Sequence, residues 1–274
     1  LGLQTYRFSI GWPRILPRGY GKVNSMGLDF YSRLVDGLLA AGITPYATLY
    51  HWDLPQALQD EGGWPARHTA KAFAEYAEAV ARRLGDRVKH WMTLNEPAVS
   101  ALLGYYWGHH APGHQNIREA IAATHHLLLG HGWAVPVLRR DSPGSQVGIV
   151  LNLNPKHPAS DSEADLRAMQ YMDALENRLY LDPLVGRPYP EEVISQHNIS
   201  LSYVQPGDMQ AMTAPVDFLG LNYYTRGIIR SQEIPEAQNA RPTVVRGPEV
   251  TEMDWEVYPE GLYEMLVRLK TEYP

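Results

Sequence analysis

An apolar run that spans Trp91–Pro97 ends in an amide, a carboxyl group and a proline. The run is typical of a buried strand, and a low-dielectric setting favours the neutral form of a carboxyl group such as that of Glu96. A neutral carboxyl group can donate a proton to a departing oxygen atom. Asn95 can hydrogen-bond a substrate hydroxyl, and the strand must stop at Pro97, which has no N–H to donate. We therefore expect a general acid here, and an exposed loop carboxylate is the alternative.

Side chains of a related kind follow other apolar runs. His51 and Trp52 come after one run, and Asn222 and Tyr224 lie at the end of another. Amides and an imidazole can bind hydroxyl groups, whereas an indole ring can cover the apolar face of a sugar ring. Taken singly, His51 and Trp52 would equally suit core packing. Their joint placement at the ends of runs favours a site for a neutral polyol.

The elements that would carry these residues follow a regular alternation. Apolar runs rich in β-branched and aromatic residues predict buried strands at Thr5–Ile10, Ile43–Tyr50, Val88–Leu94, Gln146–Leu153 and Val216–Tyr223. Helical spacing predicts helices at Leu28–Leu38, Phe73–Leu84, Ile117–Arg140 (kinked at Pro136), Leu166–Leu179 and Glu260–Lys270. The polar, proline-containing stretch 231–247 is predicted to be a long loop.

Strands that alternate with helices indicate parallel β/α units. A polar or aromatic side chain follows nearly every predicted strand, and a barrel of such units gathers those strand ends at one mouth. The sequence therefore predicts the α/β class with a (β/α)8 TIM barrel. An open doubly wound sheet is the alternative, but the glycine-rich phosphate turn expected after one of its early strands is not found in the sequence.

Composition excludes several classes of site. The 274 residues carry a net charge of -6, which argues against nucleic acid or an anionic membrane as partner. No cysteine is present, and no apolar run reaches the length of about 20 residues that a membrane span needs. Histidines gather at 109–114 and at 125–131 without the His-Glu-x-x-His spacing of a zinc site, so we expect no metal and no cofactor. No secretory leader is visible, and we expect a cytoplasmic protein.

Seven motifs resemble the retaining β-glucosidases of glycoside hydrolase family one. In family order they are Tyr6–Arg14, Leu49–Gln56, Gly62–Trp64, Thr93–Pro97, Ala111–Gly113, Phe218–Tyr224 and Trp255–Leu262. The resemblance extends over essentially the whole chain. It implies a small-molecule substrate, a β-glucoside or cello-oligosaccharide, that is hydrolysed with retention by double displacement.

The resemblance also implies roles for individual residues. Glu96 would be the general acid/base. The glycone hydroxyls would be bound by His51, Asn95 and Asn222, and Trp52 would line the same subsite. A second catalytic carboxylate would be held by Arg7 and Tyr224. Ala98 stands where many relatives have tryptophan, which implies a wider exit for the leaving group, with Trp107 as a substitute wall.

One part of the family pattern is absent. Retaining glycosidases need two carboxyl groups about 5–5.5 Å apart. The family's nucleophile lies in a Thr-Glu-Asn-Gly motif, which these 274 residues do not contain. The pattern corresponds to barrel strands two to six, with the first strand and the last two missing. We therefore expect residues 1–274 to be a single catalytic barrel domain present as an internal fragment, inactive alone.

Two other functions stay open. A sugar-binding pseudoenzyme on the same scaffold would keep the hydroxyl-binding residues and lack the nucleophile. A different barrel hydrolase with two carboxylates could share the Asn-Glu ending of a strand, although the motifs around His51 and Asn222 argue against it.

Overall fold

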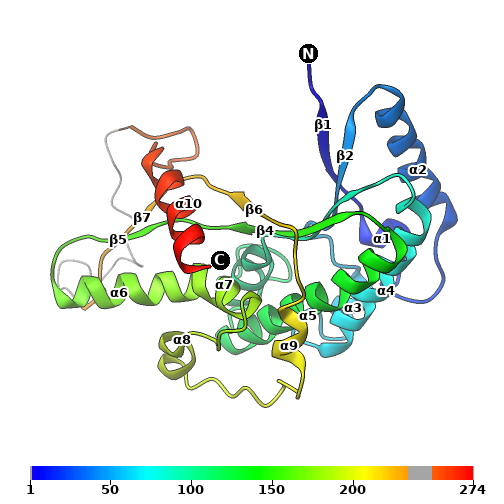
Figure 1. Cartoon of the computed structure of the whole chain (residues 1–274). Helices are drawn as coiled ribbons and strands as arrows, with labels where there is room; N and C mark the ends of the chain where they lie inside the picture. Colours follow the sequence, from blue (N-terminus) through cyan, green and yellow to red (C-terminus); the bar gives the residue numbers. More distant parts are fainter. Residues whose placement is uncertain (1, 234–248, 274) are drawn as a thin grey trace. The chain divides into compact units, whose positions relative to one another are not determined.

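The computed structural model describes residues 2–233 and 249–273 (Figure 1). Most of the loop predicted at 231–247 lies outside the described residues. The chain forms two compact units, the first made of Leu1–Leu151 and Ser200–Gly220, the second of Asn152–Ile199 and Leu221–Pro274. The single barrel domain expected for residues 1–274 stays a prediction.

Five strands form the main sheet in the order β1-β2-β3-β4-β6 (Figure 1). Neighbours from β1 to β4 pair in parallel. The strands are β1 Thr5–Ser9, β2 Thr44–Tyr50, β3 His90–Asn95, β4 Gln146–Asn152 and β6 Phe218–Asn222. All five predicted strands are therefore confirmed, with small differences at their ends. The prediction of near-continuous burial is wrong for β1, whose residues are mostly exposed, because β1 lies at the edge of this sheet.

Long helices of the first unit lie where helical spacing predicts them. They are α2 Ser25–Ala40, α4 Arg67–Leu84 and α5 Ile117–Asp141. The last of these begins after Asn116, whose side chain accepts a hydrogen bond from the N–H of Arg118 as an N-cap, and it continues past Pro136. Four shorter elements are not evident from the sequence: α1 Trp12–Ile15, α3 Gln56–Asp60, α9 Asp208–Met212 and the π-helix η1 Val99–Tyr106.

An aromatic cluster packs under the ends of β1 and β2. It consists of Trp12, Tyr50, Trp64, Phe73 and Tyr76, all buried. The hydroxyl oxygen of Tyr76 lies 2.8 Å from the carbonyl oxygen of Ile10 and 2.9 Å from that of Leu49. Buried tyrosine hydroxyls need such partners, so α4 holds both strand ends at fixed positions. The side chains that follow these strands are thus carried on a rigid support.

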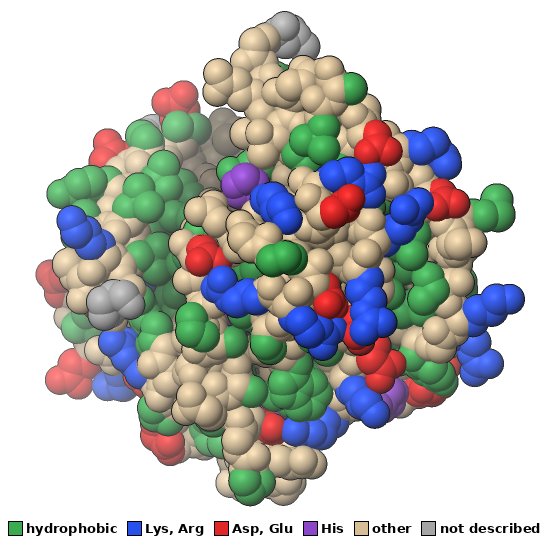
Figure 2. All heavy atoms as spheres, turned by 45° about the vertical axis from the view of Figure 1, so that its right-hand side comes forward, with side chains coloured by type: hydrophobic (Ala, Val, Ile, Leu, Met, Phe, Trp, Pro, Cys, Tyr) green, Lys and Arg blue, Asp and Glu red, His purple; other side chains and the backbone are tan. Residues whose placement is uncertain are grey.

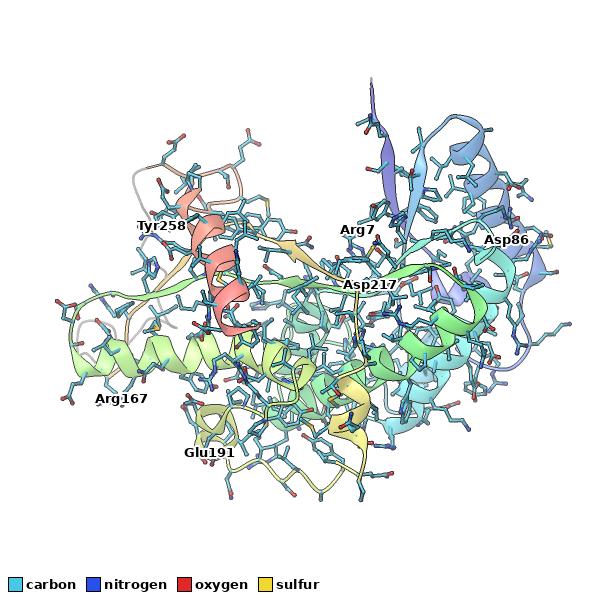
Figure 3. All side chains as sticks on the ribbon, viewed as in Figure 1. Arg7, Asp86, Arg167, Glu191, Asp217 and Tyr258 are labelled. Atoms are coloured by element: carbon cyan, nitrogen blue, oxygen red, sulfur yellow. The ribbon has the colours of Figure 1, made fainter. Side chains whose placement is uncertain are left out.

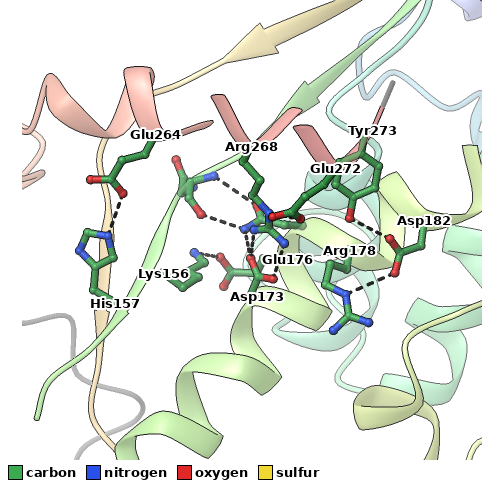
Figure 4. Close-up of polar contacts among 12 residues, drawn as sticks. Lys156, His157, Asp173, Glu176, Arg178, Asp182, Glu264, Arg268, Glu272 and Tyr273 are labelled. Carbon is green, nitrogen blue, oxygen red and sulfur yellow. Dashed lines mark hydrogen bonds and ion pairs between the residues drawn. The ribbon is translucent and has the colours of Figure 1, made fainter. Parts of the chain in front are cut away.

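The second unit combines a small sheet with helices. Its strands β5 Lys156–Pro158 and β7 Gly227–Ile229 pair in parallel. Its helical elements are α6 Glu163–Asp173, the π-helix η2 Ala174–Arg178, α7 Leu179–Leu184, α8 Glu191–Gln196 and α10 Glu260–Glu272. The single helix predicted at Leu166–Leu179 is thus a continuous helical run with one π turn. Asp173 accepts two hydrogen bonds from Arg268, of 2.6 and 2.8 Å, which join α6 to α10 (Figure 4).

Charged side chains of both signs are interspersed on the face drawn in Figure 2. Ion pairs of the first unit include Arg83 with Asp29 at 2.9 Å and Arg140 with Glu78 at 2.8 Å. Such exposed pairs contribute about 0–1 kcal/mol each, so packing supplies most of the stability. Among the helices of the described ranges, none has both the length and the apolar character required to cross a membrane.

Candidate active site

Glu96 lies where β3 leaves regular pairing. Met92 aligns with Gly148 of β4 and Asn95 with Val150, so β3 has one extra residue between the two pairs. A bulge of this kind redirects the side chains that follow it. Glu96 then adopts a left-handed backbone with φ of 48°, and its N–H donates to the carbonyl oxygen of Val150 at 2.8 Å. The residue is 3% exposed. Bulge, turn and hydrogen bond together fix where its carboxyl group points.

The amide of Asn95 is oriented by Arg7. Arg7 of β1, labelled in Figure 3, donates from one guanidinium nitrogen to Thr48 at 3.0 Å and from another to the Asn95 Oδ1 at 2.6 Å. Because Oδ1 accepts from the guanidinium, the NH₂ group of Asn95 faces the Nε2 atom of His51, 3.2 Å away. An NH₂ group can only donate, so Nε2 carries no proton and neutral His51 carries its proton on Nδ1.

The charge state of His51 agrees with that arrangement. Partial burial and the Arg7 charge lower the pKa of His51, and they outweigh the opposing effect of Glu96. A neutral imidazole whose Nε2 accepts a hydrogen bond from Asn95 can still donate one from Nδ1. His51 is therefore suited to donate a hydrogen bond to a neutral hydroxyl group.

Trp52 is held in an uncommon backbone conformation at the end of β2. Its φ is 77°, a left-handed value that costs a residue with a side chain on the order of 1–3 kcal/mol. The indole N–H donates to the backbone oxygen of Asn95 at 3.0 Å, which offsets part of that cost. The ring stays 39% exposed and lies 5.7 Å, centre to centre, from the ring of His110. An exposed indole face beside these polar groups suits contact with a sugar ring.

Beside Trp52 lies a cavity of about 670 Å³, and sequence reasoning identified few of its other walls. Its polar lining includes Gln59, which accepts a hydrogen bond of 2.7 Å from the hydroxyl group of Tyr105. The lining residues are Tyr50, Trp52, Leu54, Gln56, Gln59, Trp64, Ser100, Tyr105, His110, Ala111 and Pro112. They come from the segment between the end of β2 and Trp64, from η1 and from the loop after η1, and the π turns of η1 are not evident from the sequence.

Asp53 is a second residue that the sequence analysis did not select. Its Oδ2 accepts the N–H of Trp12 at 3.0 Å, and its Oδ1 is buried with no hydrogen-bond partner within the described residues. Burial raises the pKa of Asp53 to about 6, against the lowering effect of the backbone N–H groups around it. The one feature of the sequence that could have identified Asp53 was its position directly after Trp52.

Asn222 and Tyr224 belong to the second unit. Asn222 ends β6, and its backbone oxygen accepts a hydrogen bond of 3.2 Å from the N–H of Leu153. Tyr224 follows the strand, is 45% exposed and packs against Trp255 with 5.0 Å between ring centres. The structure thus brings five predicted site residues together in the first unit, and Asn222 and Tyr224 lie in the second. The five are Arg7, His51, Trp52, Asn95 and Glu96.

The histidine clusters have other partners than a metal. Across residues 2–233 and 249–273, no group of three histidine or acidic side chains could hold a metal ion. His125 pairs with Asp208 at 3.0 Å, and His131 lies 2.7 Å from the hydroxyl oxygen of Thr93. His114 pairs with Glu119 at 2.6 Å. The first two are core residues of α5. Trp107, expected to replace the wall lost at Ala98, follows η1 and stays untested in that role.

Comparisons with known proteins identify similar sequences in one family. The profile of "Glycosyl hydrolase family 1" matches residues 1–274. Beta-glucosidase A of Thermotoga maritima is 46% identical over 274 residues, and 1,4-beta-D-glucan glucohydrolase of Thermotoga neapolitana is 44% identical. Both matches cover all of this chain, which spans 61% and 64% of those proteins.

A solved structure agrees with these sequences. The beta-glucosidase from Thermotoga maritima in complex with glucoimidazole superposes with a TM-score of 0.90 at 44% identity. The match covers 99% of this chain and 61% of that structure. Together with the parallel strand order, this likeness confirms the predicted fold class: the described strands are part of a (β/α)8 barrel.

Proposed function

Since the chain belongs to glycosyl hydrolase family 1, we propose that the whole protein hydrolyses β-glucosides with Glu96 as its general acid/base. The observation that carries this proposal is the setting of Glu96, which is 3% exposed and directed by a bulge and a left-handed turn at the end of β3. A buried carboxyl group at a barrel mouth is suited to give a proton to a glycosidic oxygen.

The reaction would proceed in two displacements. In the first, a second carboxylate attacks the anomeric carbon while Glu96 protonates the departing oxygen. In the second, Glu96 takes a proton from water, whose oxygen bonds to the same carbon and releases the sugar with retained configuration. By family resemblance the second carboxylate belongs to a Thr-Glu-Asn-Gly stretch, which is not among these 274 residues.

The remaining residues have proposed supporting roles. His51 and Asn95 would hydrogen-bond the glycone hydroxyls, and their mutual contact of 3.2 Å supports a shared task. The exposed indole of Trp52 would cover the apolar side of the ring. By resemblance, Asn222 would add a further hydroxyl contact, and Arg7 and Tyr224 would hold the second carboxylate.

The names of the same relatives support a proposed substrate class. One is named a beta-glucosidase and another a 1,4-beta-D-glucan glucohydrolase, which supports a β-glucoside or a cello-oligosaccharide as substrate. We further propose that the protein is cytoplasmic, as the sequence predicts. Cell fractionation with an antibody against the chain tests this location.

A leaving-group comparison tests the role of Glu96. In the whole protein, Glu96→Gln should lower kcat/KM about 10²–10⁴-fold on cellobiose, whose departing oxygen needs a proton. The loss should be much smaller on a dinitrophenyl β-glucoside, whose leaving group departs as a stable anion. Azide should then restore turnover, because it displaces the enzyme carboxylate without general-base help and yields the β-glucosyl azide.

The matched control is Glu75→Gln on the exposed part of α4, which should leave both rates unchanged. Equal losses on the two substrates would remove Glu96 from the acid role. A protein that binds cellobiose but turns over neither substrate in its unaltered form would be the sugar-binding pseudoenzyme.

A further inference from the structure

Two segments of the second unit contact each other residue by residue. The first is Tyr223–Arg226, which follows β6, and the second is Trp255–Tyr258, which precedes α10. Tyr223 donates its hydroxyl to the backbone oxygen of Tyr258, and Thr225 donates to that of Glu256 at 2.9 Å. Between these contacts, the ring of Tyr224 packs against Trp255. These three consecutive residues therefore all contact the second segment, which fixes one register between the two segments.

The strongest of these contacts is a partly buried ion pair. Arg226 donates from Nε and from one terminal nitrogen to the two oxygens of Glu256, both at 2.9 Å. Glu256 is 6% exposed, and Arg226 keeps 22% of its side chain exposed. Bidentate geometry fixes both planes, so the carboxylate has one orientation. Arg226 lowers the pKa of Glu256, which keeps this carboxylate ionised.

Further contacts hold the arginine in place. Its guanidinium lies 3.9 Å from the ring centre of Tyr258, and its remaining terminal nitrogen donates to Nδ1 of His157 at 3.2 Å. Nδ1 accepts that bond, so His157 must carry its proton on Nε2, which lies 2.9 Å from Glu264 of α10 (Figure 4). Tyr258 also donates to Glu264, at 2.8 Å. The ion pair is thus tied to β5 and to α10.

We propose that Glu256, paired with Arg226, is a positioning residue that sets the place of Tyr224 through Trp255. The inference rests on the proposed function, in which Tyr224 holds the second carboxylate. Tyr224 is 45% exposed and Trp255 38% exposed, so these rings are not fixed by deep burial. Glu256, which follows Trp255 in the chain, is nearly buried. Its backbone oxygen accepts from Thr225, and its carboxylate accepts from Arg226.

Loss of the Glu256 carboxylate removes the side-chain anchor of the residue that follows Trp255, and it leaves Trp255 with its own backbone hydrogen bonds to Thr251. The indole then gains freedom, and Tyr224 loses the ring against which it packs. Catalysis depends on placement within about 0.5 Å, so this loosening lowers kcat without removing any group that touches substrate.

A double-mutant cycle in the whole protein separates positioning from general stability. Glu256→Gln should lower kcat at least 10-fold on a nitrophenyl β-glucoside. In a Tyr224→Phe background, which already lacks the hydroxyl, the same change should lower kcat less than two-fold, because residues that act as a unit are not additive. The matched control is Asp173→Asn, which breaks a bidentate pair of similar exposure between α6 and α10. That variant should lower the melting temperature and leave kcat within two-fold.

A second measurement does not depend on activity. With 5-fluorotryptophan incorporated, the ¹⁹F resonance of Trp255, assigned with Trp255→Phe, should shift or broaden in Glu256→Gln and stay unchanged in Asp173→Asn. An unchanged resonance overturns the proposal, as does a Glu256→Gln effect of equal size in both backgrounds. If the resonance responds but the unaltered protein hydrolyses no β-glucoside, the proposed function fails and the positioning of Tyr224 stands.

Discussion

Asn95 is the residue through which Arg7 acts on His51. The guanidinium sets which end of the amide faces the imidazole, and the amide sets which imidazole nitrogen carries the proton. Residue types at strand ends were enough to select Asn95 and His51, whereas Arg7 was selected through the family resemblance. The direction of each hydrogen bond was not readable from the sequence, since it depends on which atoms the fold brings within hydrogen-bond distance.

This chain of bonds predicts the effect of Asn95→Asp. A carboxylate cannot donate to Nε2 of His51, so Nε2 must carry a proton itself, either by a change of tautomer that removes the donor at Nδ1 or by protonation of the imidazole. A second negative charge would also lie beside Glu96. We expect kcat/KM on a nitrophenyl β-glucoside to fall about 100-fold or more, which corresponds to about 3 kcal/mol of lost transition-state stabilisation. Steady-state kinetics measures this.

The control for that variant is Asn24→Asp, which changes an exposed asparagine whose amide donates to the carbonyl oxygen of Arg14. It should leave kcat/KM unchanged. An Asn95→Asp protein that retains parental activity and the parental pH profile would contradict the proposed bonding.

At the scale of elements, hydrophobic runs located the strands because buried parallel strands leave a strong apolar signature. Two features that shape the site leave none. The bulge between Met92 and Asn95 depends on the register with β4, and the π turns of η1 depend on packing within an apolar stretch that reads equally well as α-helix. Asp53 was missed for a similar reason, since its setting depends on a long-range contact in which it accepts the N–H of Trp12 at the start of α1.

We expect the buried His131 of α5 to make the stability of the protein depend on pH. His131 is fully buried against Thr93, and burial lowers its pKa to about 4. In the unfolded chain a histidine titrates near its ordinary value of about 6.5. As the pH falls from about 6.5 to 4, only the unfolded state takes up this proton, so the protein loses roughly 3 kcal/mol of stability in that window.

His131→Asn keeps a polar atom near the position of Nδ1 and cannot titrate. The free energy of unfolding, measured with denaturant from pH 4 to 7, should therefore fall less steeply with acid in this variant than in the parent. His68→Asn removes a partly exposed histidine from α4 and should leave the slope as it is. Parallel slopes for His131→Asn and the parent would show that burial does not keep this group neutral.

At the scale of the whole molecule, the alternation of strands and helices predicted the fold class, and the motifs indicated the family because they occur in family order along the chain. The matching profile spans residues 1–274. Residue patterns along the chain cannot say how the two compact units are arranged, since that depends on long-range packing. The same pattern assigns one carboxyl group of the catalytic pair to this chain and the other to a motif that it does not contain.

That division of the catalytic pair predicts the behaviour of residues 1–274 expressed by themselves. Without the family's second carboxylate, no glycosyl-enzyme bond can form, and Glu96 alone can protonate a leaving oxygen but cannot stabilise the sugar cation left behind. We expect no hydrolysis of a nitrophenyl β-glucoside above the uncatalysed rate, even where circular dichroism shows folded chain. Turnover by this chain that disappears in Glu96→Gln would mean that one of its own carboxylates serves as nucleophile. Asp53, half-buried two residues from His51 and with its pKa raised to about 6, would then be the first to replace by asparagine.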